Sequence, residues 1–340
     1  MKVAIGYHIQ AGPWGGGNAF ARSLSDALIA RGDKVVYNLN NPDIDLILLT
    51  DPRGRSPQVS FHAGSILRYL VTTHPEAVVV HRINECDERK GTRSMNRLLR
   101  MANYAADHTV FISSWLQDLA VWRSGSPSCV VLNGADTSIF NDSCNRSWTR
   151  NERLRIVTHH WGGNRLKGAD VYEELDRLLS LPEWRGRIEF TYVGNVPEGT
   201  PLPHTRYVAP LNGEALAREL TAHHVYLTGS VNEPAGMHHI EGALCGLPLL
   251  YRNSGALPEY CSEYGIGFDD VEGFRGALER MMSEYYLHRE ALKSYRHTAQ
   301  RMCEGYLSLF DELLARRETI VANRKLWRNP WLVARNQIPF

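Results

Sequence analysis

The stretch from Glu233 to Pro248, EPAGMHHIEGALCGLP, stands between two short apolar runs, Val225–Thr228 before it and Leu249–Tyr251 after it. Continuous apolar runs of this length are typical of strands buried on both faces of a sheet. The residues Met237–Cys245 between them fit a helix. A strand, a helix and a second strand in this order form a unit of parallel α/β structure. This stretch therefore predicts a parallel sheet covered by helices.

The same alternation continues on both sides of that stretch. The predicted strands are Val3–Tyr7, Lys34–Asn38, Asp45–Thr50, Ala77–Ile83, Thr109–Ser113, Cys129–Leu132, Arg155–His160, Ile188–Gly194, Tyr207–Ala209, Val225–Thr228 and Leu249–Tyr251. The predicted helices are Asn18–Arg31, Thr92–Ala106, Ser114–Trp122, Ala169–Ser180, Gly213–Ala222, Met237–Cys245, Val271–Tyr286 and Leu287–Arg317. The pattern predicts two Rossmann-like domains in tandem, followed by a helical tail.

A polar segment rich in Asn, Ser, Thr and Asp, residues 136–152, interrupts the rhythm and indicates a connection between domains. We place the first domain at 1–140, the second at 141–310 and the tail at 311–340. A chain of 340 residues is long enough for two cores.

Composition excludes several classes of function. Lys and Arg total 38 against 37 Asp and Glu, so no concentrated basic charge favours nucleic acid. The N-terminal residues lack the apolar core of a signal peptide, and no run approaches the length of a membrane span. The six cysteines are scattered without zinc-ligand spacing, which favours reduced thiols and a cytoplasmic protein.

Glu233 and Glu241 are the most specific candidate site residues. Glu233 falls in the loop before the predicted helix, and Glu241 falls on the helix face that Met237 and His238 share. Such carboxylates can hold sugar and ribose hydroxyls on either side of a helix N-terminus, where a diphosphate is favoured. The alternative is a capping carboxylate and a solvated Glu.

In each domain a glycine-rich loop follows the first predicted strand. Gly12–Asn18 contains Gly15, Gly16 and Gly17, which suit an anion or substrate loop or else a flexible turn. The loop does not fit the GxGxxG motif, which weakens the hypothesis of a dinucleotide-dependent oxidoreductase. Trp161–Gly168 carries Arg165 and Lys167 at a strand end, where they could clamp a diphosphate or remain solvated.

Histidines supply further candidates. His81 ends the fourth predicted strand and would point towards a cleft if the two domains face each other; a structural role is the alternative. The pairs His159-His160, His223-His224 and His238-His239 offer at most one metal ligand each, because adjacent side chains point to different sides. We therefore predict no metal site and no cofactor.

Together these stretches resemble the retaining glycosyltransferases of the GT-B fold, in the group-1 family also called GT4. The match covers roughly residues 1–300 and includes the EX7E motif from Glu233 to Glu241 and the GALCGLPLL stretch that follows. It also includes the shorter pieces Gly15–Gly17, Phe111–Ser113, Asn133–Asp136 with Phe140, Lys167-Gly168 and Tyr192–Gly194.

The resemblance implies a nucleotide-sugar donor held between the two domains. Glu233 would hold the sugar, His81 would contact it near the reacting carbon, and Lys167 would neutralise the diphosphate. The implied donor-binding residues are Gly16, Gly17, Arg165, Lys167, Gly194, Asn195, Gly236, Met237, His238 and Glu241. One position departs from the family: Trp161 stands where an Arg is usual, and Arg165 lies closer to Lys167.

The implied reaction is transfer of a sugar, with retention and without a metal, to an acceptor hydroxyl of a glycan, lipid-linked or small-molecule substrate. Three alternatives remain open: a GT-B epimerase or hydrolase of nucleotide sugars, a binding protein without turnover, and an NAD(P)-dependent oxidoreductase. Acceptor specificity is expected in the first-domain loops Trp14–Gly17, Asp51–Ser65 and Asn84–Arg93.

The tail admits two interpretations. Trp327 and Trp331 alternate with Arg328 and Arg335, which suits a membrane-surface anchor. We favour a tail that packs on the first domain, because Pro330 and Pro339 interrupt any long amphipathic helix.

Overall fold

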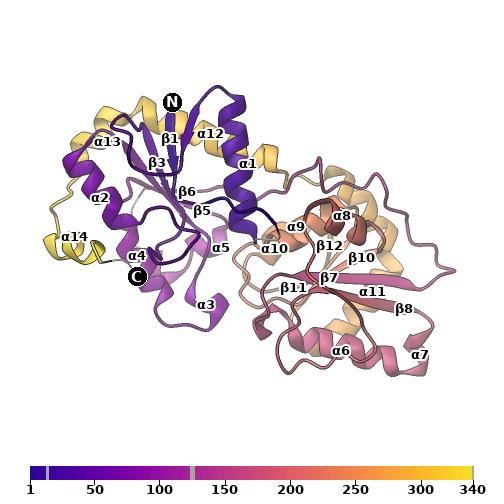
Figure 1. The fold of residues 1–340 in the computed structure, drawn as a ribbon. Helices are drawn as coiled ribbons and strands as arrows, with labels where there is room; N and C mark the ends of the chain where they lie inside the picture. Colours follow the sequence, from indigo (N-terminus) through magenta and orange to yellow (C-terminus); the bar gives the residue numbers. More distant parts are fainter. Residues whose placement is uncertain (13–14, 123–126, 339–340) are drawn as a thin grey trace. The chain divides into compact units, whose positions relative to one another are not determined.

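The computed structural model describes residues 1–12, 15–122 and 127–338, and the chain forms two compact units (Figure 1). Unit 1 consists of Met1–Ala11, Gly16–Asn133 and Ala299–Phe340, and unit 2 consists of Gly12–Gly15 and Gly134–Thr298. Beside the passages at Asn133–Gly134 and Thr298–Ala299, Ala135 and Thr298 pair in an isolated parallel bridge. The chain thus leaves unit 1 and returns to it along neighbouring segments.

Unit 1 is built on a six-stranded parallel sheet in the order β2-β1-β3-β4-β5-β6. Its strands are β1 (Lys2–Ile5), β2 (Lys34–Val36), β3 (Leu46–Leu49), β4 (Val78–Ile83), β5 (His108–Phe111) and β6 (Ser128–Val130). Alternate residues of a strand belong to different cores: Leu46 and Leu48 lie in one, Ile47 and Leu49 in the other. Both faces of the sheet are therefore covered, as continuous apolar strands predict.

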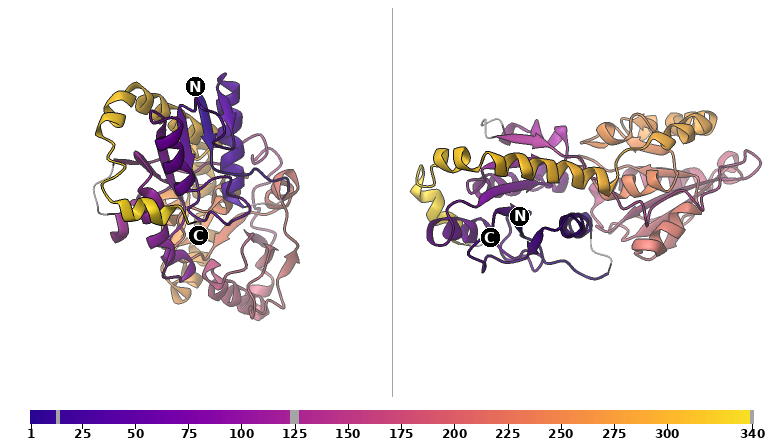
Figure 2. Two further views of the ribbon diagram at one scale, coloured as in Figure 1. Left: turned by 60° about the vertical axis from the view of Figure 1, so that its left-hand side comes forward. Right: turned by 90° about the horizontal axis from the view of Figure 1, so that it is seen from above.

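Helices from distant parts of the chain cover the two faces of this sheet. They are α1 (Gly16–Ala30), α2 (Ala63–Thr72), α3 (Asp87–Lys90), α4 (Met95–Asn103), α5 (Ser114–Gln117), the 3-10 turn η1 (Ala120–Trp122), α12 (Ala299–Ala315), α13 (Arg317–Asn323) and α14 (Pro330–Asn336). On one face α12 packs across α1 (Figure 2), and Phe20 contacts Tyr306 with ring centroids 5.1 Å apart. On the other face α2 and α4 pack with the tail.

The tail belongs to unit 1 through buried contacts. Arg324 forms an ion pair with Asp107 at 2.6 Å, and both side chains are almost fully buried. Asn329 caps α14, and the Nδ2 atom of Asn336 donates to the carbonyl oxygen of Met101 at 3.0 Å. Pro330 begins α14, because proline suits the first turn, where its missing N–H would have no helical partner. Trp327 and Trp331 remain exposed.

Unit 2 carries a second six-stranded parallel sheet, in the order β12-β11-β10-β7-β8-β9. Its strands are β7 (Leu154–His160), β8 (Ile188–Gly194), β9 (Arg206–Val208), β10 (Val225–Thr228), β11 (Leu249–Arg252) and β12 (Gly265–Phe268). The strand order reverses between β7 and β10, so their carboxyl ends flank the point where open α/β sheets bind ligands.

The helices of unit 2 follow its strands. They are the 3-10 turn η2 (Arg165–Lys167), α6 (Ala169–Ser180), α7 (Pro182–Arg185), α8 (Gly213–Thr221), α9 (Met237–Leu244), α10 (Leu257–Cys261), α11 (Val271–Ala291) and the 3-10 turn η3 (Leu292–Ser294). Tyr172 of α6 and Phe274 of α11 share one core with Ile156 of β7. No helix among the described residues is long and apolar enough to cross a bilayer.

Several predicted elements differ from the structure. The sequence prediction misses α2 and β12. A single helix over 287–317 is wrong: α11 continues to Ala291, and α12 begins only at Ala299. The break coincides with the return of the chain to unit 1, so tertiary context overrides a helical pattern. Residues 92–106 likewise form α4 only from Met95, and 114–122 divide into α5 and η1.

Candidate functional site

The candidate site lies in unit 2, where the strand order reverses. β7 ends at His160 and continues into the loop that carries Lys167, and β10 ends at Thr228 before the loop that carries Glu233. The following helix, α9, carries Glu241. The structure therefore brings Lys167, Glu233 and Glu241 to the same edge of one sheet, although they come from three different segments.

Glu233 is held in a buried and constrained position. Its residue is 2% exposed, and its Oε2 atom accepts a hydrogen bond from Lys167 Nζ at 2.5 Å. Asn232 and Ala235 nearby have φ of 51° and 146°, values that cost free energy for residues with a side chain. Such strain persists only where the surroundings fix the backbone, which is common at ligand sites.

Gly255 packs closely against the backbone of Glu233. Its φ is 64°, and a Cβ atom there would lie 2.4 Å from both the backbone nitrogen and oxygen of Glu233. The neighbouring amide of Ala256 donates to the carbonyl oxygen of Glu233 at 2.8 Å. Only glycine permits this close approach, so the position of Glu233 depends on the turn between β11 and α10.

Glu241 lies within α9 and contacts a histidine from β7. Its Oε2 atom lies 2.7 Å from His159 Nε2, and both side chains keep a small exposed fraction, 14% for Glu241 and 10% for His159. Gly236 caps α9 at its N-terminus with extended backbone. The first amides of an α-helix have no helical acceptor and favour a bound anion. A carboxylate and a helix N-terminus are thus available to one ligand.

Burial dominates the electrostatics of the surrounding histidines. It lowers the pKa of His238 to about 4 and the pKa of His160 and His239 well below the usual value. These rings are therefore neutral near pH 7. Tyr226 and Tyr172 supply hydroxyl groups to the cluster: Tyr172 lies 2.6 Å from His160 Nε2. In the described part of the chain no group of three His, Cys, Asp or Glu could hold a metal ion.

Arg165 does not join Lys167. Its guanidinium contacts the side chain of Glu173 at 3.1 Å, and it also donates to the carbonyl oxygen of Gly199 and the hydroxyl of Thr200. Trp161, which stands where the sequence resemblance implies an arginine, is 48% exposed. The cation that the structure places beside Glu233 is Lys167.

Gly194 and Asn195 shape the loop after β8. Gly194 has φ of 116°, and a Cβ atom there would lie 2.0 Å from the carbonyl oxygen of His160. Asn195 donates from Nδ2 to the carbonyl oxygen of Trp161 at 2.6 Å. Both therefore fix the backbone of the loop that follows β7. Gly236 is restricted in a similar way, because a Cβ atom would lie 2.5 Å from Cδ2 of His238.

The candidate residues of unit 1 are placed differently. His81 is fully buried within β4, and its Nδ1 atom lies 3.1 Å from Nδ2 of Asn103. Burial lowers its pKa to about 3. His81 thus contacts a residue of unit 1, and its side chain has no exposed surface that a ligand could contact. Gly16 and Gly17 begin α1, while Pro13 and Trp14 of the same loop lie outside the described residues.

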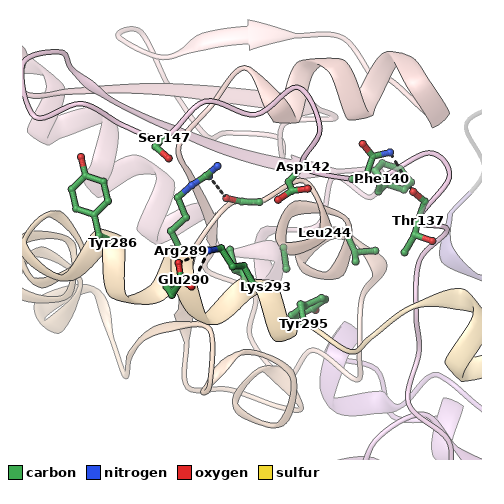
Figure 3. A pocket seen from close by; sticks show the side chains of 14 residues that line it. Thr137, Phe140, Asp142, Ser147, Leu244, Tyr286, Arg289, Glu290, Lys293 and Tyr295 are labelled. Carbon is green, nitrogen blue, oxygen red and sulfur yellow. Dashed lines mark hydrogen bonds and ion pairs between the residues drawn. The ribbon is translucent and has the colours of Figure 1, made fainter.

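A separate hollow of about 580 Å³ lies at the C-terminal end of α9 (Figure 3). Its lining includes Leu244, Asp142, Tyr286 and Arg289, whose Nη1 atom donates to the carbonyl oxygen of Gly246 at 2.8 Å. None of the candidate site residues lines this hollow, so the hollow is not part of the candidate site.

Sequence reasoning missed His159 and Tyr226 as site residues. It considered His159 only as a metal ligand, and it did not consider Tyr226. The Tyr226 hydroxyl lies 3.2 Å from Nδ1 of both His159 and His238. A histidine pair directly before a glycine-rich loop was an available signal for His159, because strand ends in this fold face ligands. Nothing local distinguishes Tyr226 from a core tyrosine.

No family model and no curated protein matches the chain. Solved structures do match. Sucrose-phosphate synthase from Thermosynechococcus elongatus is 16% identical, with a TM-score of 0.66 over 92% of this chain and 99% of that one. HepE from Anabaena, solved in complex with UDP, is 12% identical, with a TM-score of 0.64 over 92% and 100%. A glycosyltransferase from Rickettsia africae is 13% identical, with a TM-score of 0.60 over 92% and 97%.

Identities this low establish the fold and leave the activity to the site itself. The matched structures are glycosyltransferases that the chain covers along nearly their whole length. Their architecture agrees with the two parallel sheets and the helical tail described above. The chain has the GT-B fold.

Proposed function

We propose that the protein transfers a sugar from a nucleotide-diphosphate sugar to an acceptor hydroxyl. The observation that carries this proposal is the meeting of Lys167 and Glu233 at the strand-order reversal, with Glu241 on the helix that follows. A cation, two carboxylates and a helix N-terminus suit a diphosphate flanked by two sets of hydroxyls. HepE, a structural neighbour, was solved with UDP and with UDP-glucose, which supports the same ligand class.

Each group then has a defined task. Lys167 and the first amides of α9 neutralise the diphosphate as it leaves, when its negative charge grows. Glu233 holds the hydroxyls of the sugar, and Glu241 holds the ribose. Lys167 is paired with Glu233, so each side chain holds the other at the site. Such preorganisation lowers the cost of ordering them on binding.

The chemistry follows from these tasks. The acceptor hydroxyl attacks the anomeric carbon on the face from which the diphosphate departs, so the configuration is retained. The protein contributes position and charge stabilisation without a dedicated nucleophile. We propose that no metal is required, because Lys167 and the helix amides provide the positive charge. The acceptor is a glycan, a lipid-linked sugar or a small molecule, and the protein acts in the cytoplasm. His81 has none of these roles, because its side chain is fully buried.

Incubation with a panel of nucleotide sugars, read by mass spectrometry, tests the proposal. We expect release of nucleoside diphosphate and, with an acceptor present, a product heavier by one sugar. Glu233→Gln should abolish turnover, while Glu214→Ala, at a side chain 81% exposed on α8, should retain it. An epimerised or hydrolysed donor without any acceptor product would contradict transfer and favour the GT-B epimerase or hydrolase.

One observation favours a binding protein without turnover. Arg165 is engaged with Glu173, Gly199 and Thr200, so it does not replace the arginine absent at Trp161. A site with one cation at the leaving group could bind a nucleotide sugar and transfer it slowly or not at all. Tight binding of a nucleotide sugar by calorimetry, without any product over the whole panel, would establish this alternative.

A further inference from the structure

A buried chain of side chains joins the two glutamates of the candidate site. Tyr226 of β10 is fully buried, and its hydroxyl oxygen lies 3.2 Å from His159 Nδ1 and 3.2 Å from His238 Nδ1. The opposite nitrogens of the two rings face carboxylates. His159 Nε2 lies 2.7 Å from Glu241 Oε2, and His238 Nε2 lies 3.6 Å from Glu233 Oε2. One hydroxyl thus stands between two imidazoles, each of which faces a different glutamate.

The number of protons limits what this chain can do. A tyrosine hydroxyl carries one proton and donates it once, and a neutral imidazole carries one proton on either nitrogen. If Tyr226 donates to one Nδ1 atom, that ring has its own proton on Nε2 and donates it to its carboxylate. The other ring must then donate from Nδ1 to Tyr226, and its Nε2 atom has no proton. Only one of the two glutamates can therefore receive an imidazole N–H at a time.

The distances select one of the two arrangements. A nitrogen and a carboxylate oxygen at 2.7 Å need a proton between them, so we assign to His159 a neutral ring with its proton on Nε2, which accepts from Tyr226 at Nδ1. His238 then donates from Nδ1 to Tyr226. Its Nε2 atom is buried and has no hydrogen-bond partner among the described residues, and at 3.6 Å it stays beyond hydrogen-bond distance from Glu233.

The backbone fixes the position of the hydroxyl. The amide of His159 donates to the Tyr226 oxygen at 3.2 Å, and the carbonyl oxygen of the same residue lies 3.3 Å away. Donation of the hydroxyl proton to that carbonyl would leave the unprotonated Nδ1 atom of His159 without a donor. The short contact to Glu241 therefore also argues that the hydroxyl proton points to His159.

We propose that Tyr226 couples the two carboxylates, so that engagement of Glu241 by a ligand transfers the single imidazole N–H contact to Glu233. This inference rests on the proposed function, in which Glu241 meets the ribose and Glu233 the sugar. Ribose hydroxyls that donate to Glu241 Oε2 compete with His159 Nε2 for that oxygen. When they displace it, His159 Nε2 releases its proton to solvent and the Tyr226 hydroxyl proton passes to His159 Nδ1. The proton of His238 Nδ1 passes to the Tyr226 oxygen, and His238 Nε2 takes one proton from solvent, so the three protons of the two rings and the hydroxyl are conserved.

The consequence for the reaction is an ordered site. Once His238 carries its proton on Nε2, it can donate to Glu233 and hold this carboxylate in place for the sugar. Nucleotide binding at one end of the chain thereby prepares the sugar contact at the other end. Tyr226 is a positioning residue in this scheme, because it acts on the glutamates through the two histidines and touches no ligand itself.

Nitrogen-15 NMR of the histidine rings tests the proton arrangement without any nucleotide. In the full-length ligand-free protein labelled at histidine, we expect His159 to be protonated at Nε2 and His238 at Nδ1. His159→Gln and His238→Gln assign the signals. Two rings protonated at the same nitrogen, or a doubly protonated His159, would overturn the proposal. Because no nucleotide is added, this result is independent of whether the protein uses one.

The coupling itself is tested by changing Glu241 and observing the protonation of His238. Glu241→Gln removes the carboxylate charge that holds the proton of His159, so the proton of His238 should move from Nδ1 to Nε2. The same change in a protein that also carries Tyr226→Phe should leave the His238 signals unmoved. Unchanged His238 signals in Glu241→Gln alone would contradict the coupling.

Tyr172→Phe provides the matched control. Tyr172 is also fully buried and contacts His160, but the relay does not pass through it. We expect this variant to preserve the response of His238 to Glu241→Gln. Equal loss of the response in Tyr172→Phe and Tyr226→Phe would show a general packing effect and overturn the specific role of Tyr226. If Tyr226→Phe is not folded by its melting curve, His159→Gln replaces it, since it interrupts the same chain one residue away.

Addition of UDP separates this inference from the proposed function. UDP should move the His238 proton to Nε2 in the unsubstituted protein and leave it in place in Tyr226→Phe. In turnover assays Tyr226→Phe should lower kcat more than it raises KM for the donor. If UDP does not bind at all, the proposed function fails for this nucleotide, while the ligand-free NMR result still decides whether the relay exists.

Discussion

Glu233 and Glu241 lie in one motif but in different surroundings. Glu233 is nearly fully buried against Lys167, whereas Glu241 keeps some exposure beside His159. A buried carboxylate next to a cation is expensive to leave unpaired, so removal of either partner affects the other. The two glutamates should therefore respond differently to substitution.

We expect Glu241→Ala to weaken donor binding about tenfold to a hundredfold, the loss expected for one charge-assisted contact. Glu233→Gln should mainly lower kcat, because the sugar is the part of the donor that changes in the transition state. Steady-state kinetics on both variants measures the difference. Wild-type constants in both would show that the motif is not the donor site.

Lys167→Ala should cost more nucleotide affinity than Arg165→Ala. Lys167 is buried beside Glu233, while Arg165 is on the surface with its own partners. A charge-assisted contact to a diphosphate contributes about 1.5–3 kcal/mol, and an exposed pair contributes little. Calorimetry with a nucleoside diphosphate checks this. A larger loss for Arg165→Ala would place the diphosphate near Glu173 and Thr200 instead.

Helix packing explains where single glycines matter at the scale of elements. A Cβ atom at Gly64 in α2 would lie 2.0 Å from the carbonyl oxygen of Asn336 in α14, whereas Gly276 in α11 has open space around it. We expect Gly64→Ala to lower the melting temperature because it separates α2 from α14. Gly276→Ala should raise stability by about 0.5–1 kcal/mol, since alanine favours helix. Equal effects of the two changes would contradict this packing.

The tail is an element that stabilises unit 1. Deletion of residues 324–340 removes Leu326, Leu332 and Val333 from an apolar core and leaves Asp107 without Arg324. Loss of a partner from a buried ion pair alone costs about 3–5 kcal/mol. We therefore expect a clearly lower melting temperature by calorimetry.

Substitution of the exposed tryptophans provides the control for this deletion. Trp327→Ala with Trp331→Ala should leave the melting temperature unchanged, because these side chains are 62% and 59% exposed. A deletion that melts normally but no longer binds anionic liposomes would instead make the tail a membrane anchor.

The whole molecule shows which properties are readable from sequence. Parallel strands were predictable because burial on both faces produces continuous apolar runs, and β8 and β10 have the predicted limits. The short strand β12, with two glycines among its four residues, lacks that signal. The interruption between α11 and α12 depends on the return of the chain to unit 1, a long-range property.

The candidate site shows the same division. Glu233, Lys167 and Glu241 were predictable from the positions of loops relative to strands, because strand ends of one sheet meet at one edge. The pairing of His159 with Glu241 depends on how α9 packs against β7, which no local pattern specifies. The place of His81 depends on a long-range contact in the same way, because its Nδ1 atom lies beside Asn103 of α4, 22 residues further along the chain.

Removal of residues 299–340 should unfold unit 1 and spare unit 2. α12 supplies Met302, Tyr306 and Phe310 to the core that contains β1 and α1, whereas the core of unit 2 is complete within 134–298. Limited proteolysis of this truncated chain should degrade unit 1 and leave a fragment that begins near Gly134. Protection of both units would show that α12 is dispensable.

The discontinuity of unit 1 also sets an order for folding on the ribosome. Translation delivers residues 1–133 first, but the helix that closes their core emerges only after all of unit 2. At about 5–20 residues per second, the nascent N-terminal segment waits for roughly ten seconds or more with an apolar sheet face that α1 covers only in part. Unit 2 can close its core earlier, although it is made later. Residues 1–133 are thus the part of the nascent chain that most needs protection by chaperones.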